Sequence, residues 1–128
     1  MSDTLIAVSL AAERHLHAGT FSAPLAHQSS GSTALPRIEY MQGGGDATGF
    51  INSTATRLAT GLLLVTPVAQ DEAEANALAR EVLNHMPITT ELTEGSEGIG
   101  HIAGPIRVAG TQWDAGTARI PITIPFTN

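Results

Sequence analysis

The chain has 128 residues and a mass of 13.3 kDa, the size of one ordinary domain with a single core. Hydrophobic residues make up 42%, which excludes a disordered chain, whereas charged residues make up only 14%, below the ~25% of an average soluble domain. Six arginines against twelve acids give a net charge of −6, which argues against nucleic-acid backbone binding and polybasic membrane binding. With no cysteine, disulfides, thiolate zinc sites and cysteine nucleophiles are excluded.

The remaining surface should be rich in neutral threonine, serine, alanine and glycine, which suits a subunit packed against neighbours. No apolar run approaches the ~20 residues of a membrane span, and Met1–Thr4 lacks the basic start of a signal peptide. We therefore expect an intracellular or particle-borne soluble protein.

The first element is a helix predicted from about Thr4 to His17, capped by Asp3 and stopped by Gly19. Its apolar residues recur at helical spacing: Leu5, Val8, Ala12 and Leu16. Residues 20–35 are rich in serine, alanine, glycine and proline, which predicts mostly loop, with a short strand possible near Phe21.

Two strands follow, separated by glycines. Residues 36–41 alternate apolar with polar and predict a strand, and the glycine-rich stretch that continues to about residue 56 predicts a flexible loop. Residues 57–68 contain the apolar run Leu62–Val65, which is typical of a central strand covered on both faces. Pro67 marks the end of that strand.

The strongest helix signal covers residues 71–86. Ala75, Leu78, Ala79, Val82, Leu83 and Met86 form one apolar stripe. Acids crowd the first turn, where the helix dipole favours them, and Pro87 ends the run.

The last third of the chain predicts a flexible loop or hairpin over about 88–100 and two strands over 102–113 and 117–127. Asp114-Ala115-Gly116 joins these strands as a hairpin turn. The element order is therefore α-β-β-α-β-β in a single domain spanning residues 1–128. It predicts an α+β fold with two helices and a mixed, mostly antiparallel sheet.

Two prolines in the last strand predict its position in the sheet. Pro121 and Pro125 lie four residues apart, so their missing N–H groups fall on one side of the strand. We expect this strand to lie at an edge of the sheet, with its proline side protected from further pairing.

No motif in the sequence predicts a catalytic, cofactor or metal site. A Ser/His/Asp enzyme lacks any local signature, and Asp71, Glu72 and Glu74 are explained by their place at a helix start. His15 and His17, two residues apart on a helix, diverge too far to share a metal. The glycine cluster lacks the Gly-Lys-Ser/Thr ending of a phosphate loop.

A few charged residues and prolines are candidates for contacts with other subunits. Arginine suits bidentate ion pairs at interfaces, and four arginines lie in or beside predicted strands. A solvated strand face explains them about equally well. The interface candidates are Arg37, Glu39, Arg57, Arg107, Asp114, Arg119, Pro121 and Pro125.

The order of elements resembles the phage tail terminator family. The similarity lies in a short N-terminal helix, a strand of the Pro-Arg-Ile-Glu-Tyr type at 36–40, a glycine-rich stretch and a strong apolar strand at 57–65. A helix at 71–86 and a closing hairpin ending in Arg-Ile-Pro-Ile-Thr-Ile-Pro-Phe at 119–126 complete it. The resemblance covers nearly the whole chain and rests on pattern and element order.

This resemblance implies a structural virion protein of the tail or neck, present in the host cytoplasm during assembly. It implies a homohexameric ring that caps the head-proximal end of the tail tube and stops its polymerisation. The implied partners are the chain itself, the tail-tube protein and the head-side connector or stopper protein. DNA would pass through the lumen as cargo, where net negative charge reduces its retention. No cofactor, membrane or catalytic residue is implied.

Two alternatives stay open. The first is another neck component, such as a head-completion, stopper or minor tail protein, with similar composition. The second is a small α+β ligand-binding protein or enzyme, which would need a pocket with converging polar groups.

Overall fold

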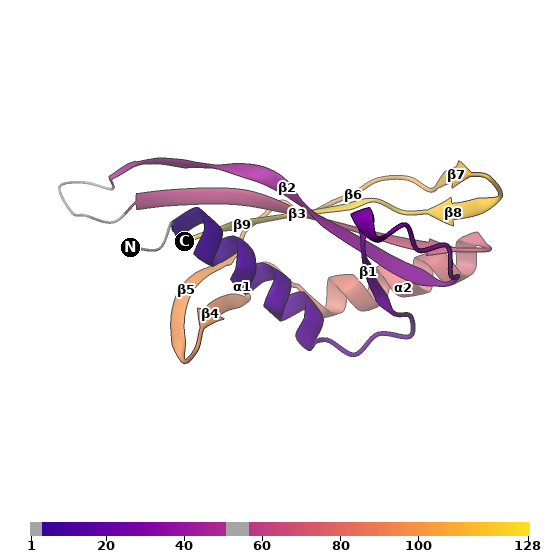
Figure 1. The fold of residues 1–128 in the computed structure, drawn as a ribbon, viewed down its shortest axis with the longest axis horizontal. Coiled ribbons are helices and arrows are strands. Elements are labelled where there is room, and N and C mark those ends of the chain that lie inside the picture. The colour runs from indigo at the N-terminus through magenta and orange to yellow at the C-terminus, as the bar shows by residue number, and fades with distance from the viewer. Residues whose placement is uncertain (1–3, 51–56) are drawn as a thin grey trace.

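The computed structural model describes residues 4–50 and 57–128 (Figure 1). The helices are α1 (Thr4–Ala18), the short 3-10 helix η1 (Gln28–Ser30) and α2 (Glu72–His85). The strands are β1 (Leu25–His27), β2 (Arg37–Phe50), β3 (Arg57–Ala69), β4 (Glu91–Glu94), β5 (Glu97–Ile102), β6 (Arg107–Val108), β7 (Gln112–Asp114), β8 (Thr117–Arg119) and β9 (Ile122–Thr127).

All described strands belong to one sheet. Its main order is β1-β2-β3-β9-β5-β4, with β6 paired to β9 and the β7–β8 hairpin attached to β3 through β8. The pair β1–β2 is parallel and the other pairs are antiparallel. The predicted α+β class with a mixed, mostly antiparallel sheet is therefore confirmed.

Both α-helices lie on one side of the twisted sheet (Figure 1). The predicted apolar stripes are buried there, with Val8 and Leu16 from α1 and Leu78 and Val82 from α2 at most 2% exposed. The Asp71 side chain caps α2 by accepting a 2.7 Å hydrogen bond from the Glu74 backbone N–H. The predicted Asp3 cap of α1 lies outside the described residues.

The central strand β3 is covered on one face. Leu63 and Val65 are completely buried against the helices, whereas Leu62 is 37% exposed and Leu64 is half-buried. The prediction of a central strand is right, since β2 flanks it on one side and β8 and β9 on the other. The prediction of cover on both faces is wrong within the single chain, because both helices pack on the same side.

The last strand is not at an edge, contrary to the prediction from its prolines. β9 pairs with β3 on one side and with β5 and β6 on the other. Proline lacks a donor but keeps its acceptor: the carbonyls of Pro121 and Pro125 accept 2.9 Å hydrogen bonds from the N–H groups of Ala109 and Ala103. Where these prolines lack N–H donors, the strand beside β9 is interrupted and is split into β5 and β6.

The stretch predicted as a flexible loop over about 41–56 is instead, up to Phe50, the far half of β2, and residues 51–56 lie outside the described residues. Close packing explains Gly45, because a Cβ there would collide with the Thr60 carbonyl of β3. The same holds for Gly61 on β3, where a Cβ would lie 2.5 Å from the Phe126 ring. The register of β2 shifts between Gln42 and Gly45, where Gly44 has a φ of +84°.

Two other boundaries differ from the sequence prediction. The strand expected over 102–113 is three pieces, the end of β5, β6 and β7. The region 88–100, expected as a flexible loop or hairpin, forms the β4–β5 hairpin. The Asp114-Ala115-Gly116 turn joins β7 to β8 as predicted, with positive φ at Ala115 and Gly116.

Candidate functional site

The face of the sheet turned away from the helices is the candidate functional surface, and we call it the open face. Residues paired directly across strands point to the same side, so the register defines its members. Its described members are Arg37, Glu39, Met41, Thr60, Leu62, Leu64, Thr66, the fully buried Val68, Arg107, Gln112, Asp114, Thr117, Arg119, Thr123, Pro125 and Thr127, and alternation along the chain adds Pro121. A row of apolar and threonine side chains thus runs along the sheet, and the charged side chains that the structure describes lie in one part of it.

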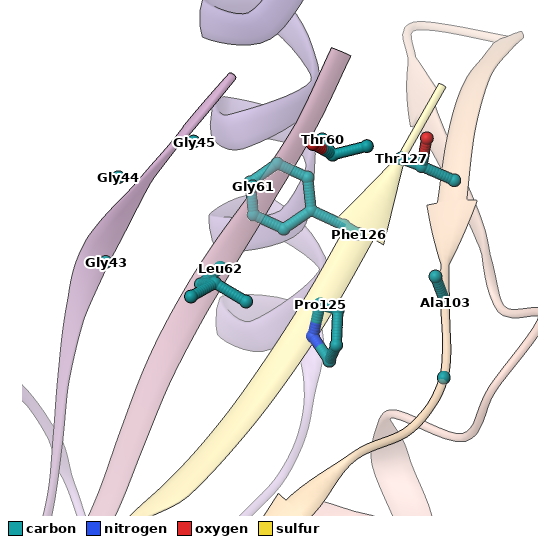
Figure 2. A pocket seen from close by; sticks show the side chains of 11 residues that line it. Gly43, Gly44, Gly45, Thr60, Gly61, Leu62, Ala103, Pro125, Phe126 and Thr127 are labelled. Carbon is teal, nitrogen blue, oxygen red and sulfur yellow. The ribbon is translucent and has the colours of Figure 1, made fainter. Parts of the chain in front are cut away.

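A hollow of about 540 Å³ occupies one end of the open face. Figure 2 shows Leu62 and Pro125 from neighbouring strands beside it, with Thr60 and Thr127 further along. Gly43–Gly45 of β2 line the opposite side without side chains. The residues that the structure describes in this lining carry no ionisable side chain, so they suit packing against neutral groups rather than acid–base chemistry.

A second hollow, of about 350 Å³, lies further along the same face. Met41, Leu64, Thr66, Thr123 and Arg119 are among the residues that line it. The two hollows make the open face concave, and most of its members are threonines and charged residues. Between them lies an apolar strip of Met41, Leu62 and Leu64, and an uncovered strip of this kind marks a candidate surface for a partner.

A three-residue ionic cluster lies on the open face. Glu39 accepts a 2.8 Å hydrogen bond from Arg37 Nε and a 2.5 Å hydrogen bond from Arg119 Nη2, and the three side chains are 11–20% exposed. Burial is the strongest influence on the Glu39 pKa and raises it, but the hydrogen bonds and charges of both arginines outweigh burial and lower the pKa overall. Two guanidinium groups share one carboxylate, so the cluster carries a surplus positive charge.

The structure brings some of the predicted interface residues together. Arg37, Glu39 and Arg119 pair within the chain. Arg107 and Asp114 are exposed on β6 and β7.

The remaining three interface candidates lie elsewhere along the sheet. Pro121 and Pro125 are half-buried beside the hollows. Arg57 begins β3, and its side chain lies outside the described part of the structure.

Sequence reasoning missed the apolar members of this surface. The sequence pattern predicts Leu62, Leu64 and Met41 only as core or strand residues. Their signal was the uninterrupted apolar run 62–65: one alternate set packs on the helices and leaves the other set without cover in the single chain.

Sequence reasoning also missed a histidine pair that joins the two helices on the other side of the sheet. The His15 and His85 rings stack at 4.3 Å, and each Nε2 lies within hydrogen-bond distance of the other residue's carbonyl oxygen, at 2.9 and 2.5 Å. His17 instead contacts the Tyr40 hydroxyl at 3.0 Å, so His15 and His17 diverge as predicted. This pair fastens the C-terminal ends of α1 and α2 together.

Within residues 4–50 and 57–128, no group of three or more histidine, aspartate or glutamate side chains could hold a metal ion. The helices in that part of the chain are too short or too polar to cross a membrane.

The chain shares its fold with solved structures, although no family model and no curated protein matches it. One solved chain, known only by a sequence identifier, is 21% identical with a TM-score of 0.66 and covers 99% of this chain and 95% of its own. A chain from the virion of a native gene transfer agent particle is 16% identical with a TM-score of 0.62 and covers 98% of both. At these identities the likeness establishes a common fold over nearly the whole chain.

Proposed function

We propose that this chain is a phage-like structural virion protein that caps the head-proximal end of a tail tube as a homohexameric ring. In this role it stops tube polymerisation, forms the joint to the head-side connector and lets DNA pass through its lumen. In this role it acts by contact with its neighbours.

The observation that carries the proposal is the end-to-end likeness to a gene transfer agent virion chain. The match covers 98% of both chains, so it concerns the whole domain rather than a recurring substructure. The same element order underlies the resemblance to tail terminators. The open face supports it as well, because the apolar strip of Met41, Leu62 and Leu64 is uncovered in the single chain and is a candidate surface for a partner.

The assembly is tested by mass photometry and negative-stain imaging over a wide concentration range, alone and with purified tail tubes. Six copies of a 13.3 kDa chain give about 80 kDa. The expected result is a ring with a central hole near that mass, bound at one end of each tube. A compact dimer with a filled centre, or uniform binding along the length of the tube, would contradict this proposal.

The choice between a tail terminator and another neck component rests on the partner. We expect the chain to retain tail-tube protein in a pull-down and to shorten tubes when added during their polymerisation. Retention of the portal-side proteins alone, with tube length unchanged, would instead assign it to head completion.

A further inference from the structure

The open face and the tip of the β4–β5 hairpin have complementary charge and shape. The hairpin carries Glu91, Glu94 and Glu97, all exposed, and it projects from the helix side of the molecule (Figure 1). Arg14 of α1 donates a 2.8 Å hydrogen bond to the Thr93 carbonyl near the tip of the hairpin, but the three carboxylates leave the hairpin with a net negative charge. The tip is therefore acidic and stands away from the sheet.

The open face has the opposite charge near its second hollow. The described side chains there include three positive ones, Arg37, Arg107 and Arg119. The negative ones are Glu39 and Asp114. Arg107 is exposed beside Thr123, and the two other arginines share the Glu39 carboxylate. This part of the face has a net positive charge in a chain whose overall charge is −6.

We propose that the open face of one copy receives the acidic β4–β5 hairpin of the next copy, and that this contact builds the ring. The inference rests on the proposed self-assembly and names its surfaces. Donor and acceptor lie on opposite sides of the subunit, which makes the contact head-to-tail, as a closed ring requires. The hairpin carboxylates meet the surplus charge of the arginines, while its small tip residues, Gly95 and Ser96, lie over the apolar row.

A second copy fits this surface better than an unrelated partner does. The chain supplies both halves of the charge pairing. The Glu39 cluster also keeps its arginines fixed before association, which reduces the entropy lost on binding.

The test uses the natural absence of cysteine. Single cysteines are placed at Thr123, in the centre of the open face, and at Ser96, on the hairpin tip. The two variants are mixed at up to millimolar concentration with a short bismaleimide. The matched control pairs Ser96→Cys with Ala73→Cys, which is exposed on α2.

The expected result is a Thr123–Ser96 product at least about tenfold more abundant than the control product. Arg107→Glu should lower its yield by roughly tenfold, and adding Glu94→Arg and Glu97→Arg to the Ser96→Cys partner should restore it. The control of equal charge change replaces the two hairpin substitutions by Glu72→Arg and Glu74→Arg, both exposed on α2, and it should restore nothing.

The proposal is overturned if the Thr123–Ser96 product is absent, or if the control product between Ala73→Cys and Ser96→Cys is equally abundant. The result is separable from the proposed role in the tail. If rings cap tubes but this cross-link does not form, the proposed function stands and the proposed contact is wrong. A cross-linked oligomer that ignores tubes keeps the contact and rejects the role.

Discussion

The two faces of the sheet are built from alternate residues of the same strands, yet they differ in burial and in residue type. On the helix face, Leu63, Val65, Ile122 and Ile124 are buried and hold the domain together. On the open face, Leu62 is exposed and threonines, prolines and an ionic cluster fill the neighbouring positions. The side of the strand on which a residue falls thus decides whether it stabilises the core or lies on the face to which we assign the subunit contact.

Adjacent leucines provide the largest contrast between the faces. Leu63→Ala removes a completely buried side chain from the core and should lower the free energy of unfolding by about 3–5 kcal/mol. Urea denaturation monitored by circular dichroism measures this. A loss below about 1 kcal/mol would show that the helix face is not the main source of stability.

Gly61→Ala tests the close contact between β3 and the Phe126 ring of β9, next to the first hollow. A methyl group there would sit 2.5 Å from the ring, and we expect a loss of about 1–3 kcal/mol as the ring is displaced. Gly110 is the control, since a Cβ there meets nothing within 4 Å. Equal thermal unfolding midpoints for the two alanine variants would contradict the close approach.

The ionic cluster should make the open face sensitive to pH. The folded pKa of Glu39 is lowered from 4.5, so its contribution is present above that pH and is lost as pH falls through the lowered value. Glu39→Gln leaves two arginines without their acceptor and should cost about 1–2 kcal/mol at pH 7, with a smaller loss between pH 5 and 3 than the wild type shows.

Urea titrations at several pH values measure this difference, with the exposed Asp114→Asn as the matched control. Parallel stability curves for wild type and Glu39→Gln across this range would refute the role of the cluster.

The smallest effect on stability is expected for Leu62→Ser on the open face. It should change the free energy of unfolding by about 0.5 kcal/mol or less, because the side chain is already 37% exposed in the single chain. The same substitution should weaken self-association strongly, as measured by mass photometry. Undiminished assembly would exclude this part of the open face from the subunit contact.

Local patterns predicted the elements well. The periodicity of residues 71–86 and the acids of its first turn were enough to place α2 and its Asp71 cap, because a helix is determined by neighbours in sequence. The apolar run at 62–65 likewise placed the central strand. These signals need no knowledge of distant residues.

Pairing between distant segments was not predictable in the same way. Pro121 and Pro125 indicate missing donors, but not whether a distant strand uses the remaining acceptors. Nothing local joins Glu39 to Arg119, 80 residues away, and the glycines of β2 cannot be distinguished from a loop until Thr60 and Gly61 lie beside them. The open face depends on such pairings, so the sequence could suggest its charged members and not its shape.

The interruption between β5 and β6, opposite Pro121 and Pro125, also has a consequence for which substitutions and insertions the chain can accept during evolution. The β4–β5 hairpin joins the rest of the sheet through the pairs His101 with Thr127 and Ile102 with Phe126, after which the ladder breaks. Residues between Thr93 and Gly98 can therefore be exchanged or lengthened without altering the register of β9. The break therefore leaves the hairpin tip free to vary among related chains, which could contact different neighbours in this way while keeping the same scaffold.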